Sequence, residues 1–239
     1  MFNEELDCFI GVVSYKRPHN VKDLHKTLGT NQITWYVRAE EEKLYQDEGA
    51  ITKVVKYSTL GDKRNKILQD GKEYDTIFMD DDIERFRFAI NTKEEYNVTF
   101  QELVMEMKKK LNDVPNVKLC GVNSIAKPFF YNPKRPISLT NFCVGTISLV
   151  QKGSTILHDT QFKMKEDYDF TLQHIKTYGG AVRLNYAMVK AKHWKNPGGQ
   201  TEIRTDEIMD ADIKRLQAKW GKCIQLNPKR AHEILLRVT

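Results

Sequence analysis

The chain of 239 residues is 40% hydrophobic and 29% charged, with 38 Lys and Arg against 32 Asp and Glu and a pI near 9.0. This composition excludes an intrinsically disordered chain, a collagen-like chain and a low-complexity linker. The length predicts one or two domains at about 150 residues each, with a core large enough to fold without disulfides or a structural metal.

The basic excess lies at one end of the chain. Residues 1–160 carry 23 basic and 23 acidic side chains, whereas residues 161–239 carry 15 basic and 9 acidic ones. Such asymmetry is typical of a protein with a polyanionic partner, either nucleic acid or a phosphorylated ligand. A solvated basic surface gives the same count, so both interpretations stay open.

Neither a membrane segment nor an export signal is expected. The apolar runs are far shorter than the roughly 20 residues of a membrane-spanning helix, and the first residues, MFNEELD, are acidic. The four cysteines (Cys8, Cys120, Cys143 and Cys223) lie in or beside apolar runs and lack metal-site or disulfide-framework spacing. We therefore expect buried free thiols in a reducing cytoplasm.

The first part of the chain alternates strands and helices. Cys8–Ser14 is a continuous apolar run, as in a strand buried on both faces of a parallel sheet. Pro18 suits the first turn of a following helix, and Gly29 ends it. This alternation predicts a right-handed parallel α/β sheet. The other elements predicted here are strands at Ile33–Arg38, Ile51–Tyr57 and Asp75–Met79, a short charged helix after Arg38, and a helix at Leu60–Leu68.

The second part has a different pattern, and we expect it to form a mixed half of the same domain. Thr99 is placed to cap a helix whose apolar face ends at Leu111. Three aromatics and two prolines in Lys127–Arg135 predict a long irregular loop. The remaining elements are strands at Val117–Val122, Val144–Val150 and Val182–Lys190, helices at Asp167–Tyr178 and Asp206–Trp220, and a turn at Asn196–Gln200.

The strongest chemical signal is the run Asp80-Asp81-Asp82 after a buried strand. Three consecutive carboxylates repel one another, and a divalent cation would remove that cost; Mg²⁺ and Mn²⁺ prefer such oxygen ligands. In open α/β sheets, ligands bind beyond the carboxyl ends of the strands, where this run is predicted to lie. The alternative is an acidic turn that only caps a helix.

Two basic segments are predicted at the same edge of the sheet. Ser14-Tyr15-Lys16-Arg17-Pro18 ends the first strand, and a turn of this kind can hold a phosphate or nucleobase through backbone N–H groups and positive charge. It is also compatible with a plain turn. Gly61-Asp62-Lys63-Arg64-Asn65 places Arg64 near the carboxylates, where a structural Arg–Asp pair is the alternative. The sequence has no P-loop and no G-x-G-x-x-G motif.

Two further motifs come later in the chain. Lys165-Glu166-Asp167-Tyr168-Asp169-Phe170 begins a helix, where acidic side chains suit the helix dipole and where a fixed carboxylate also suits a general base. His193, in Lys192–Gly199, is either a metal ligand, an acceptor contact or a structural histidine.

In this order, the motifs S-Y-K-R-P, G-D-K-R-N, D-D-D, E-D-Y-D and H-W…P-G-G resemble those of glycosyltransferases with the GT-A fold. Within that group, the chain looks most like the TET-associated glycosyltransferases of phages, which modify hydroxylated or hydroxymethylated pyrimidines in DNA. The resemblance covers about residues 8–205. It implies a single GT-A domain: a Rossmann-like mixed α/β sheet flanked by helices, with a nucleotide-sugar half (1–98), an acceptor half (99–205) and a C-terminal helical extension (206–239).

The resemblance also implies a role for each matching residue. Asp82 binds Mn²⁺ or Mg²⁺, Asp80 contacts the metal and the donor ribose or sugar, and Asp167 is the base that acts on the acceptor hydroxyl. The donor is a UDP-sugar by analogy. The implied nucleotide-sugar contacts are Ser14, Tyr15, Arg17, Arg64, Asp80 and Asp81, and the implied metal ligands are Asp80, Asp82 and His193.

The basic last third then suits a DNA acceptor. Phosphate contacts are available from Lys190, Lys192, Lys195, Arg204, Lys214 and Arg215. A base flipped from a duplex needs an aromatic side chain to stack on, for which Trp194 and Tyr131 are candidates. Three alternatives remain open: a GT-A transferase acting on a glycan, lipid or protein; a sugar-1-phosphate nucleotidyltransferase, although its usual Gly-rich loop is missing; and a non-enzymatic nucleic-acid-binding module. The oligomeric state is not specified by the sequence.

Overall fold

The computed structural model describes residues 1–56, 59–192 and 198–238. Its helices are α1 (Asn20–Leu28), α2 (Glu42–Asp47), α3 (Leu60–Asp70), α4 (Phe100–Asn112), α5 (Glu166–Tyr178) and α6 (Asp206–Trp220). Its strands are β1 (Phe2–Asn3), β2 (Cys8–Val13), β3 (Thr34–Val37), β4 (Ile51–Val54), β5 (Thr76–Asp80), β6 (Ile83–Ala89), β7 (Glu95–Val98), β8 (Leu119–Asn123), β9 (Ile137–Ser138), β10 (Ile147–Val150), β11 (Val182–Ala191), β12 (Ile224–Leu226) and β13 (Ile234–Leu236).

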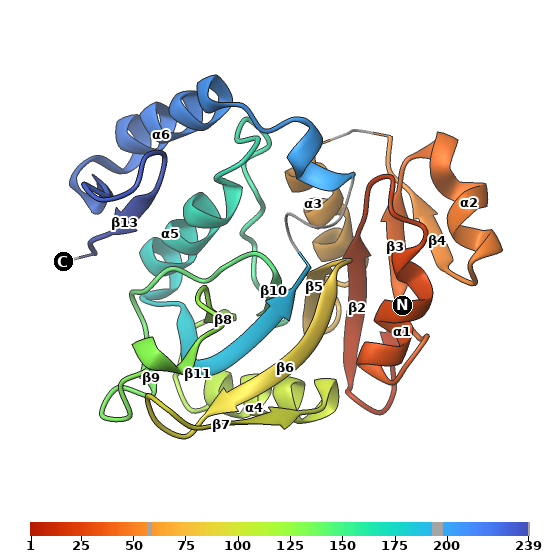
Figure 1. Ribbon diagram of the computed structural model, residues 1–239, viewed down its shortest axis with the longest axis horizontal. Coiled ribbons are helices and arrows are strands. Elements are labelled where there is room, and N and C mark those ends of the chain that lie inside the picture. The colour runs from red at the N-terminus through yellow and green to blue at the C-terminus, as the bar shows by residue number, and fades with distance from the viewer. Residues whose placement is uncertain (57–58, 193–197, 239) are drawn as a thin grey trace.

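One large mixed sheet organises the domain (Figure 1), with the strand order β4-β3-β2-β5-β10-β8-β11-β6-β7. The four strands from β4 to β5 are parallel, as the alternation of the N-terminal half predicts. β10 runs antiparallel to both of its neighbours, β5 and β8, and β6 runs antiparallel to β11 and β7. The expected single α/β domain with a mixed sheet is therefore confirmed.

Helices cover both faces of the sheet and bury the core between the layers. Apolar side chains of α1 and α4 pack on one face, and those of α3 and α5 pack on the other. The contact between α3 and β2 is close at Gly11, where a Cβ atom would lie 2.6 Å from two side-chain carbons of Ile67. Any larger residue there would push α3 away from the strand whose end carries Ser14.

The helix ends follow the local signals in the sequence. Thr99 and Glu102 form a reciprocal capping box at the start of α4, as the Thr99 prediction requires, and Thr59 and Asp62 form a second one before α3. Gly29 ends α1 in the left-handed conformation, with φ of 69°. The cap at Thr59 therefore fixes where α3, the helix that carries Arg64, begins.

Several elements differ from the prediction. β6 and β7 were not predicted, because β6 carries Glu84, Arg85 and Arg87 and lacks a clean polar–apolar alternation. The third predicted strand ends at Val54. Residues 127–135 form a loop, as expected, but it contains a short 3₁₀ turn at Pro128–Phe130.

The C-terminal segment 206–239 is more than a helical extension, because a β12–β13 hairpin follows α6. It also anchors the segment before α5. The buried carboxylate of Asp212 in α6 accepts hydrogen bonds from the backbone N–H groups of Lys163, Met164 and Lys165 at 2.8, 2.7 and 3.3 Å. The C-terminal segment thus helps to place the first residues of α5.

The cysteine prediction is confirmed for three residues and modified for one. Cys8, Cys120 and Cys143 are buried free thiols, and Cys223 is a free thiol that is partly exposed. Across the described ranges, every helix is too short or too polar to cross a bilayer.

Candidate active site

The acidic run forms the turn between β5 and β6. Asp80 is the last residue of β5 and lies beside Val13 at the end of the parallel strand β2. The backbone N–H of Lys192, just after β11, donates to the carbonyl oxygen of Asp82 at 2.9 Å. The ends of three strands therefore meet at the acidic turn, at the carboxyl edge of the parallel half where ligands of α/β sheets bind.

A guanidinium group of the chain itself lies against two of the carboxylates. Arg17 Nη1 is 3.0 Å from Asp81 Oδ1 and 3.5 Å from Asp82 Oδ2, and all three side chains are buried. The Ser14 hydroxyl donates to the other oxygen of Asp81. The argument that the run needs a metal ion to offset its repulsion is therefore wrong for Asp81, whose carboxylate positions Ser14 and Arg17 and has little surface left for a nucleotide-sugar.

Two backbone N–H groups of the S-Y-K-R-P turn, those of Lys16 and Arg17, have side-chain partners within the protein. The N–H of Lys16 donates to the Glu41 carboxylate, and that of Arg17 donates to the Tyr45 hydroxyl at 2.9 Å. These two N–H groups are therefore not free to hold a phosphate. The hydrogen bond to Glu41 satisfies the N–H of Lys16 and puts a negatively charged carboxylate beside it.

Gly198 and Gly199 of the predicted P-G-G element reach this same turn, whereas Pro197 lies outside the described residues. Arg17 Nη2 donates to the carbonyl oxygen of Gly198 at 2.9 Å, and the N–H of Gly199 donates to the carbonyl of Tyr15 at 3.0 Å. Both glycines have positive φ, 83° and 67°, and a Cβ at Gly199 would lie 2.6 Å from the Arg17 guanidinium. His193, Trp194 and Lys195 lie outside the described residues.

Tyr15 of this turn is partly exposed, and cations surround its ring. The Arg38 guanidinium carbon lies 4.1 Å from the ring centroid, with Lys16 Nζ at 5.1 Å and Lys63 Nζ at 5.7 Å. Aromatic and guanidinium planes suit a nucleobase, and ammonium groups suit phosphates. The sequence did not single out Arg38 or assign a role to Lys63, because only the fold brings them beside Tyr15.

Lys63 gives a prediction about stability. Its side chain is buried, its ammonium donates to the carbonyl oxygen of Ser14, and burial lowers its pKa to about 8 although the charge of Glu41 opposes the shift. Because the unfolded chain keeps this proton up to about pH 10.5, the free energy of unfolding should rise as the pH increases from 8 to 10.5. We expect Lys63→Met to raise the free energy of unfolding at pH 7 by about 2 kcal/mol. This is the gain from no longer burying a charge, less the loss of one hydrogen bond.

Urea unfolding of Lys63→Met and the wild type at pH 7 and pH 10 measures this difference, which should shrink at the higher pH. Lys66→Met, in the same helix but partly exposed and paired with Asp70, is the matched control and should show no such pH dependence. An equal difference at both pH values would contradict the prediction.

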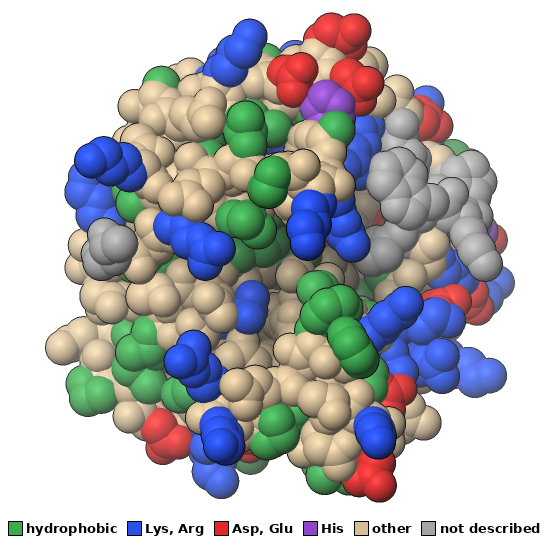
Figure 2. All heavy atoms as spheres, turned by 60° about the vertical axis from the view of Figure 1, so that its left-hand side comes forward, with side chains coloured by type: hydrophobic (Ala, Val, Ile, Leu, Met, Phe, Trp, Pro, Cys, Tyr) green, Lys and Arg blue, Asp and Glu red, His purple; other side chains and the backbone are tan. Residues whose placement is uncertain are grey.

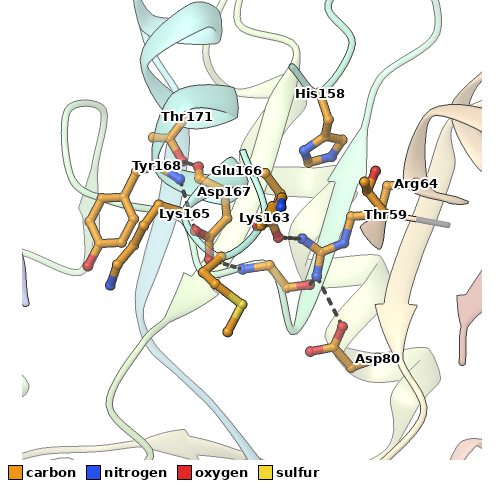
Figure 3. Close-up of polar contacts among 12 residues, drawn as sticks. Thr59, Arg64, Asp80, His158, Lys163, Lys165, Glu166, Asp167, Tyr168 and Thr171 are labelled. Carbon is orange, nitrogen blue, oxygen red and sulfur yellow. Dashed lines mark hydrogen bonds and ion pairs between the residues drawn. The ribbon is translucent and has the colours of Figure 1, made fainter. Parts of the chain in front are cut away.

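Arg64 connects the acidic turn to the start of α5 (Figure 3). Its side chain is only 2% exposed. Nη1 lies 2.6 Å from Glu166 Oε1, and Nη2 donates to Asp80 Oδ1 at 3.0 Å and to the Gly145 carbonyl at 2.7 Å. The structural Arg–Asp pair is thus present, and a guanidinium engaged in this way holds two carboxylates in place and has little surface for direct contact with a diphosphate.

The two acidic residues at the start of α5 have different surroundings. Asp167 is partly exposed, and its carboxylate accepts hydrogen bonds from the N–H groups of Gly145 at 3.2 Å and Tyr168 at 3.0 Å. Glu166 is buried, and its Oε2 has no hydrogen-bond partner among the described residues. Burial raises the pKa of both carboxyls, and the nearby charge of Arg64 opposes the rise. A fixed, partly exposed carboxylate with a raised pKa suits a general base.

The acidic turn fits a divalent cation that shares its coordination with a ligand. Asp80 is the most accessible of the three carboxylates, with 30% of its side chain exposed and only Oδ1 bound to Arg64. The described residues contain no group of three His, Cys, Asp or Glu side chains arranged to hold a metal. Mg²⁺ binds in just this way in many enzymes, with one or two carboxylates and the phosphates of a substrate.

His158 is a further buried residue beside Arg64 that sequence reasoning missed (Figure 3). Its ring stacks on Phe170 at 3.9 Å, and neither ring nitrogen meets hydrogen-bond geometry with a described residue. Burial and the charge of Arg64 lower its pKa well below the ordinary value. We therefore interpret His158 as an uncharged packing residue behind the ion pairs.

Several of the basic residues of the last third have carboxylate partners within the chain. Lys190 binds Glu84 at 2.6 Å, and Lys192 binds Asp23 at 2.8 Å. Arg215 also has a carboxylate partner, Asp212 in the same helix. The charge excess of residues 161–239 is therefore a weaker sign of a polyanion site than the residue count suggests.

Tyr131 does not fit the role of a stacking aromatic. Its side chain is only 8% exposed and packs with Ala89 and Met188 on the sheet. The prediction that it receives a flipped base is wrong, because the 3₁₀ turn before it directs Phe129 and Phe130, not Tyr131, toward solvent.

No protein-family model matches the chain, and no curated protein does. Solved structures of glucosyl-3-phosphoglycerate synthase from Mycobacterium tuberculosis are similar to it. The complex with Mn²⁺, UDP and glucosyl-3-phosphoglycerate has a TM-score of 0.55 and 11% identity, covering 92% of this chain and 83% of that chain. The complex with Mg²⁺ and UDP has the same score and identity, covering 93% and 85%. Likeness at this identity establishes the fold, that of GT-A glycosyltransferases.

Proposed function

We propose that this protein is a metal-dependent glycosyltransferase that moves a sugar from a nucleotide-sugar to an acceptor hydroxyl. The observation that carries the proposal is the Arg64 bridge, which connects the acidic turn at Asp80 to Glu166 and to the carbonyl of Gly145, whose N–H in turn donates to Asp167. Sugar transfer needs a charged site for the departing diphosphate and a base for the acceptor close together, and this bridge holds one candidate for each.

The donor half is residues 1–98. Asp80 and Asp82 would hold Mn²⁺ or Mg²⁺, which when bound supplies Lewis-acid stabilisation of the departing diphosphate. Tyr15 offers its ring to the nucleobase, and the cations around it suit the phosphates. Ser14, Arg17 and Asp81 position this surface through their mutual hydrogen bonds. A UDP-sugar is the proposed donor, supported by the fold shared with an enzyme solved with UDP and either cation.

The acceptor half is residues 99–205, where Asp167 removes the proton of the attacking hydroxyl. Its two backbone hydrogen bonds fix the carboxylate, and its raised pKa makes it a stronger base than an ordinary aspartate. Glu166 and Arg64 are positioning residues, because their contacts are with each other and with the chain. His193 is proposed as a further metal ligand.

The proposed acceptor is the hydroxyl of a modified pyrimidine, hydroxymethylcytosine or hydroxycytosine, in phage DNA. The resemblance of the motifs to the TET-associated glycosyltransferases supports this acceptor, and the net charge of +6 is compatible with it. Such a protein would act in the cytoplasm of the host cell, a compartment that suits its free thiols.

The test is mass spectrometry of nucleosides from hydroxymethylcytosine- or hydroxycytosine-containing DNA, incubated with the protein, Mn²⁺ and a panel of UDP-sugars. The expected result is a modified nucleoside heavier by one sugar residue, formed only when the divalent cation is present. Transfer to small hydroxyl acceptors but never to modified DNA would reject the DNA acceptor and keep the glycosyltransferase. No turnover of any nucleotide-sugar would reject the proposed function.

Asp167→Asn tests the proposed base. We expect kcat to fall by about 10²–10⁴-fold with little change in the KM for the donor, because the amide cannot take the proton. In the wild type, the acid limb of the pH–rate profile should lie above the ordinary carboxyl range near pH 4, since burial raises this pKa. Asp113→Asn, at the exposed end of α4, is the control and should leave kcat unchanged. An active Asp167→Asn enzyme would remove Asp167 from the mechanism.

A further inference from the structure

One long stretch of the chain contains no acidic residue at all. Residues 114–158 include Lys118, Lys127, Lys134, Arg135 and Lys152 but neither Asp nor Glu. The stretch supplies Gly145 to the candidate site and then, as residues 124–136, an exposed loop between β8 and β9. We call residues 124–136 the aromatic-basic loop. Its positive charge lies outside the basic last third of the chain.

The loop exposes two aromatic rings among unpaired cations. Phe129 is 72% exposed and Phe130 is 59% exposed, and their rings meet edge to face with centroids 5.1 Å apart. Lys127, Lys134 and Arg135 are exposed, and their side chains have no acidic partner among the described residues. Large exposed apolar side chains cost free energy in water, so a surface that presents them in a fixed arrangement suits a binding role.

The loop is held in place at several points. Arg87 of β6 donates to the Ala126 carbonyl at 3.0 Å, and Asn185 of β11 donates from its side chain to the Arg135 carbonyl at 2.8 Å. Tyr131 is buried between these anchors against Met188. The rings of Phe129 and Phe130 are therefore presented by a braced turn, which reduces the entropy lost on binding.

Basic side chains lie between this loop and the acidic turn. Arg85 of β6 is the direct cross-strand partner of Lys190 in β11, and like charges in that position destabilise a sheet. Lys190 is compensated by Glu84, whereas Arg85 is exposed and has no acidic partner among the described residues. By strand alternation, Arg85 lies on the same face as Arg87, which holds the loop. Figure 2 shows a hollowed face of the molecule with Lys, Arg and hydrophobic side chains around the depression.

We propose that Arg85, Lys190 and the aromatic-basic loop bind a single-stranded segment of nucleic acid, with Phe129 and Phe130 stacking on its bases. This inference deepens the proposed function and rests on it, since the bound strand would carry the acceptor. Phosphates would bind the exposed cations, and bases would stack on the exposed rings, which is how proteins bind single strands without reading sequence.

The distance between the aromatic-basic loop and the acidic turn suits a nucleic-acid strand that reaches the candidate active site. Arg87 follows Asp82 by five residues in the same segment, so the loop anchor is about 16 Å from the acidic turn at about 3.3 Å per residue. A membrane surface fits less well, because the apolar tip is two rings wide with cations and amides on both sides, whereas an interfacial helix presents a whole apolar face.

The experiment is fluorescence anisotropy of a labelled single-stranded DNA of about 20 nucleotides, titrated with the full-length protein at several salt concentrations. Phe129→Ala/Phe130→Ala should weaken binding by about 10–100-fold. Arg85→Ala/Lys190→Ala should reduce the slope of log K against log salt by about 1.4, as for two phosphate contacts on a single strand. Tyr96→Ala/Met105→Ala removes equally exposed apolar side chains near β7 and α4 and should leave affinity unchanged.

Equal affinity of the Phe129→Ala/Phe130→Ala protein and the wild type overturns the inference, as does loop-dependent binding to phosphatidylglycerol vesicles without binding to DNA. Unfolding curves of each variant separate loss of binding from loss of fold. Divalent-dependent hydrolysis of a UDP-sugar by the wild type, measured without DNA, tests the proposed function separately. Hydrolysis without loop-dependent DNA binding overturns this inference alone, and loop-dependent binding without hydrolysis supports it while rejecting the enzyme.

Discussion

Replacing Asp82 with asparagine should lower metal-dependent sugar transfer by about 10³-fold, and Asp80→Asn should have a similar effect. The reason is that a divalent cation contributes several kcal/mol of stabilisation to the charge on a departing diphosphate, and the amide is a far poorer ligand. Steady-state transfer rates over a range of Mn²⁺ concentrations measure the effect. For Asp80→Asn, the Mn²⁺ concentration giving half-maximal rate should rise as well, since Asp80 is the more accessible carboxylate.

The structure offers two comparisons for these variants. Asp113→Asn, on the surface, should keep the wild-type rate and metal response. Asp81→Asn should act mainly on stability, because the Asp81 carboxylate is buried against Ser14 and Arg17. If Asp82→Asn keeps full metal-dependent activity, the acidic turn is a structural cluster held by Arg17 and the proposed metal site is wrong.

Replacing Arg64 with methionine should lower the free energy of unfolding by about 3–5 kcal/mol, the usual cost of removing one partner from a buried ion pair. Without the guanidinium, Glu166 and the Gly145 carbonyl lose a buried partner. Urea denaturation followed by circular dichroism measures the change. Lys43→Met, which breaks the exposed pair with Asp47, is the control and should change the free energy of unfolding by less than about 0.5 kcal/mol.

A double variant identifies the cause of the loss. Arg64→Met/Glu166→Gln should recover part of the stability lost in Arg64→Met, because the second substitution removes the unpaired buried charge. A milder probe is Gly145→Ala, whose Cβ would lie 2.5 Å from Arg64 Nη1 and would displace the guanidinium. Arg64→Met with an unfolding free energy within about 1 kcal/mol of the wild type would show that the bridge is not a structural support.

Much of the local structure could be predicted because its causes are local. The apolar run at Cys8–Val13, the Thr99 cap and Gly29 each act within a few residues, and the elements they predict are present. β6 escaped prediction because its pairing partner β11 lies about a hundred residues away in the chain and three of its seven side chains are charged.

The candidate site also has one part that the sequence predicted and another that only tertiary contacts decided. The acidic run, Arg64 and Asp167 were identifiable as residue types in a recognisable order, and the fold does bring the first two together. Arg38, Glu166 and His158 acquired their places only through tertiary contacts. The S-Y-K-R-P turn shows the same limit, since the N–H groups of Lys16 and Arg17 are bound by Glu41 and Tyr45, residues whose partners no local pattern reveals.

The sequence by itself determined the alternation of strands and helices in the N-terminal part, the position of three carboxylates after a buried strand and the basic balance of the chain. Only the tertiary structure decided which charges neutralise which. Arg17 reaches Asp81 across 64 positions, and Arg64 reaches Glu166 across 102. The physical reason is desolvation: a charge buried by the fold needs an opposite charge beside it, and that neighbour is set by packing and not by proximity in the chain.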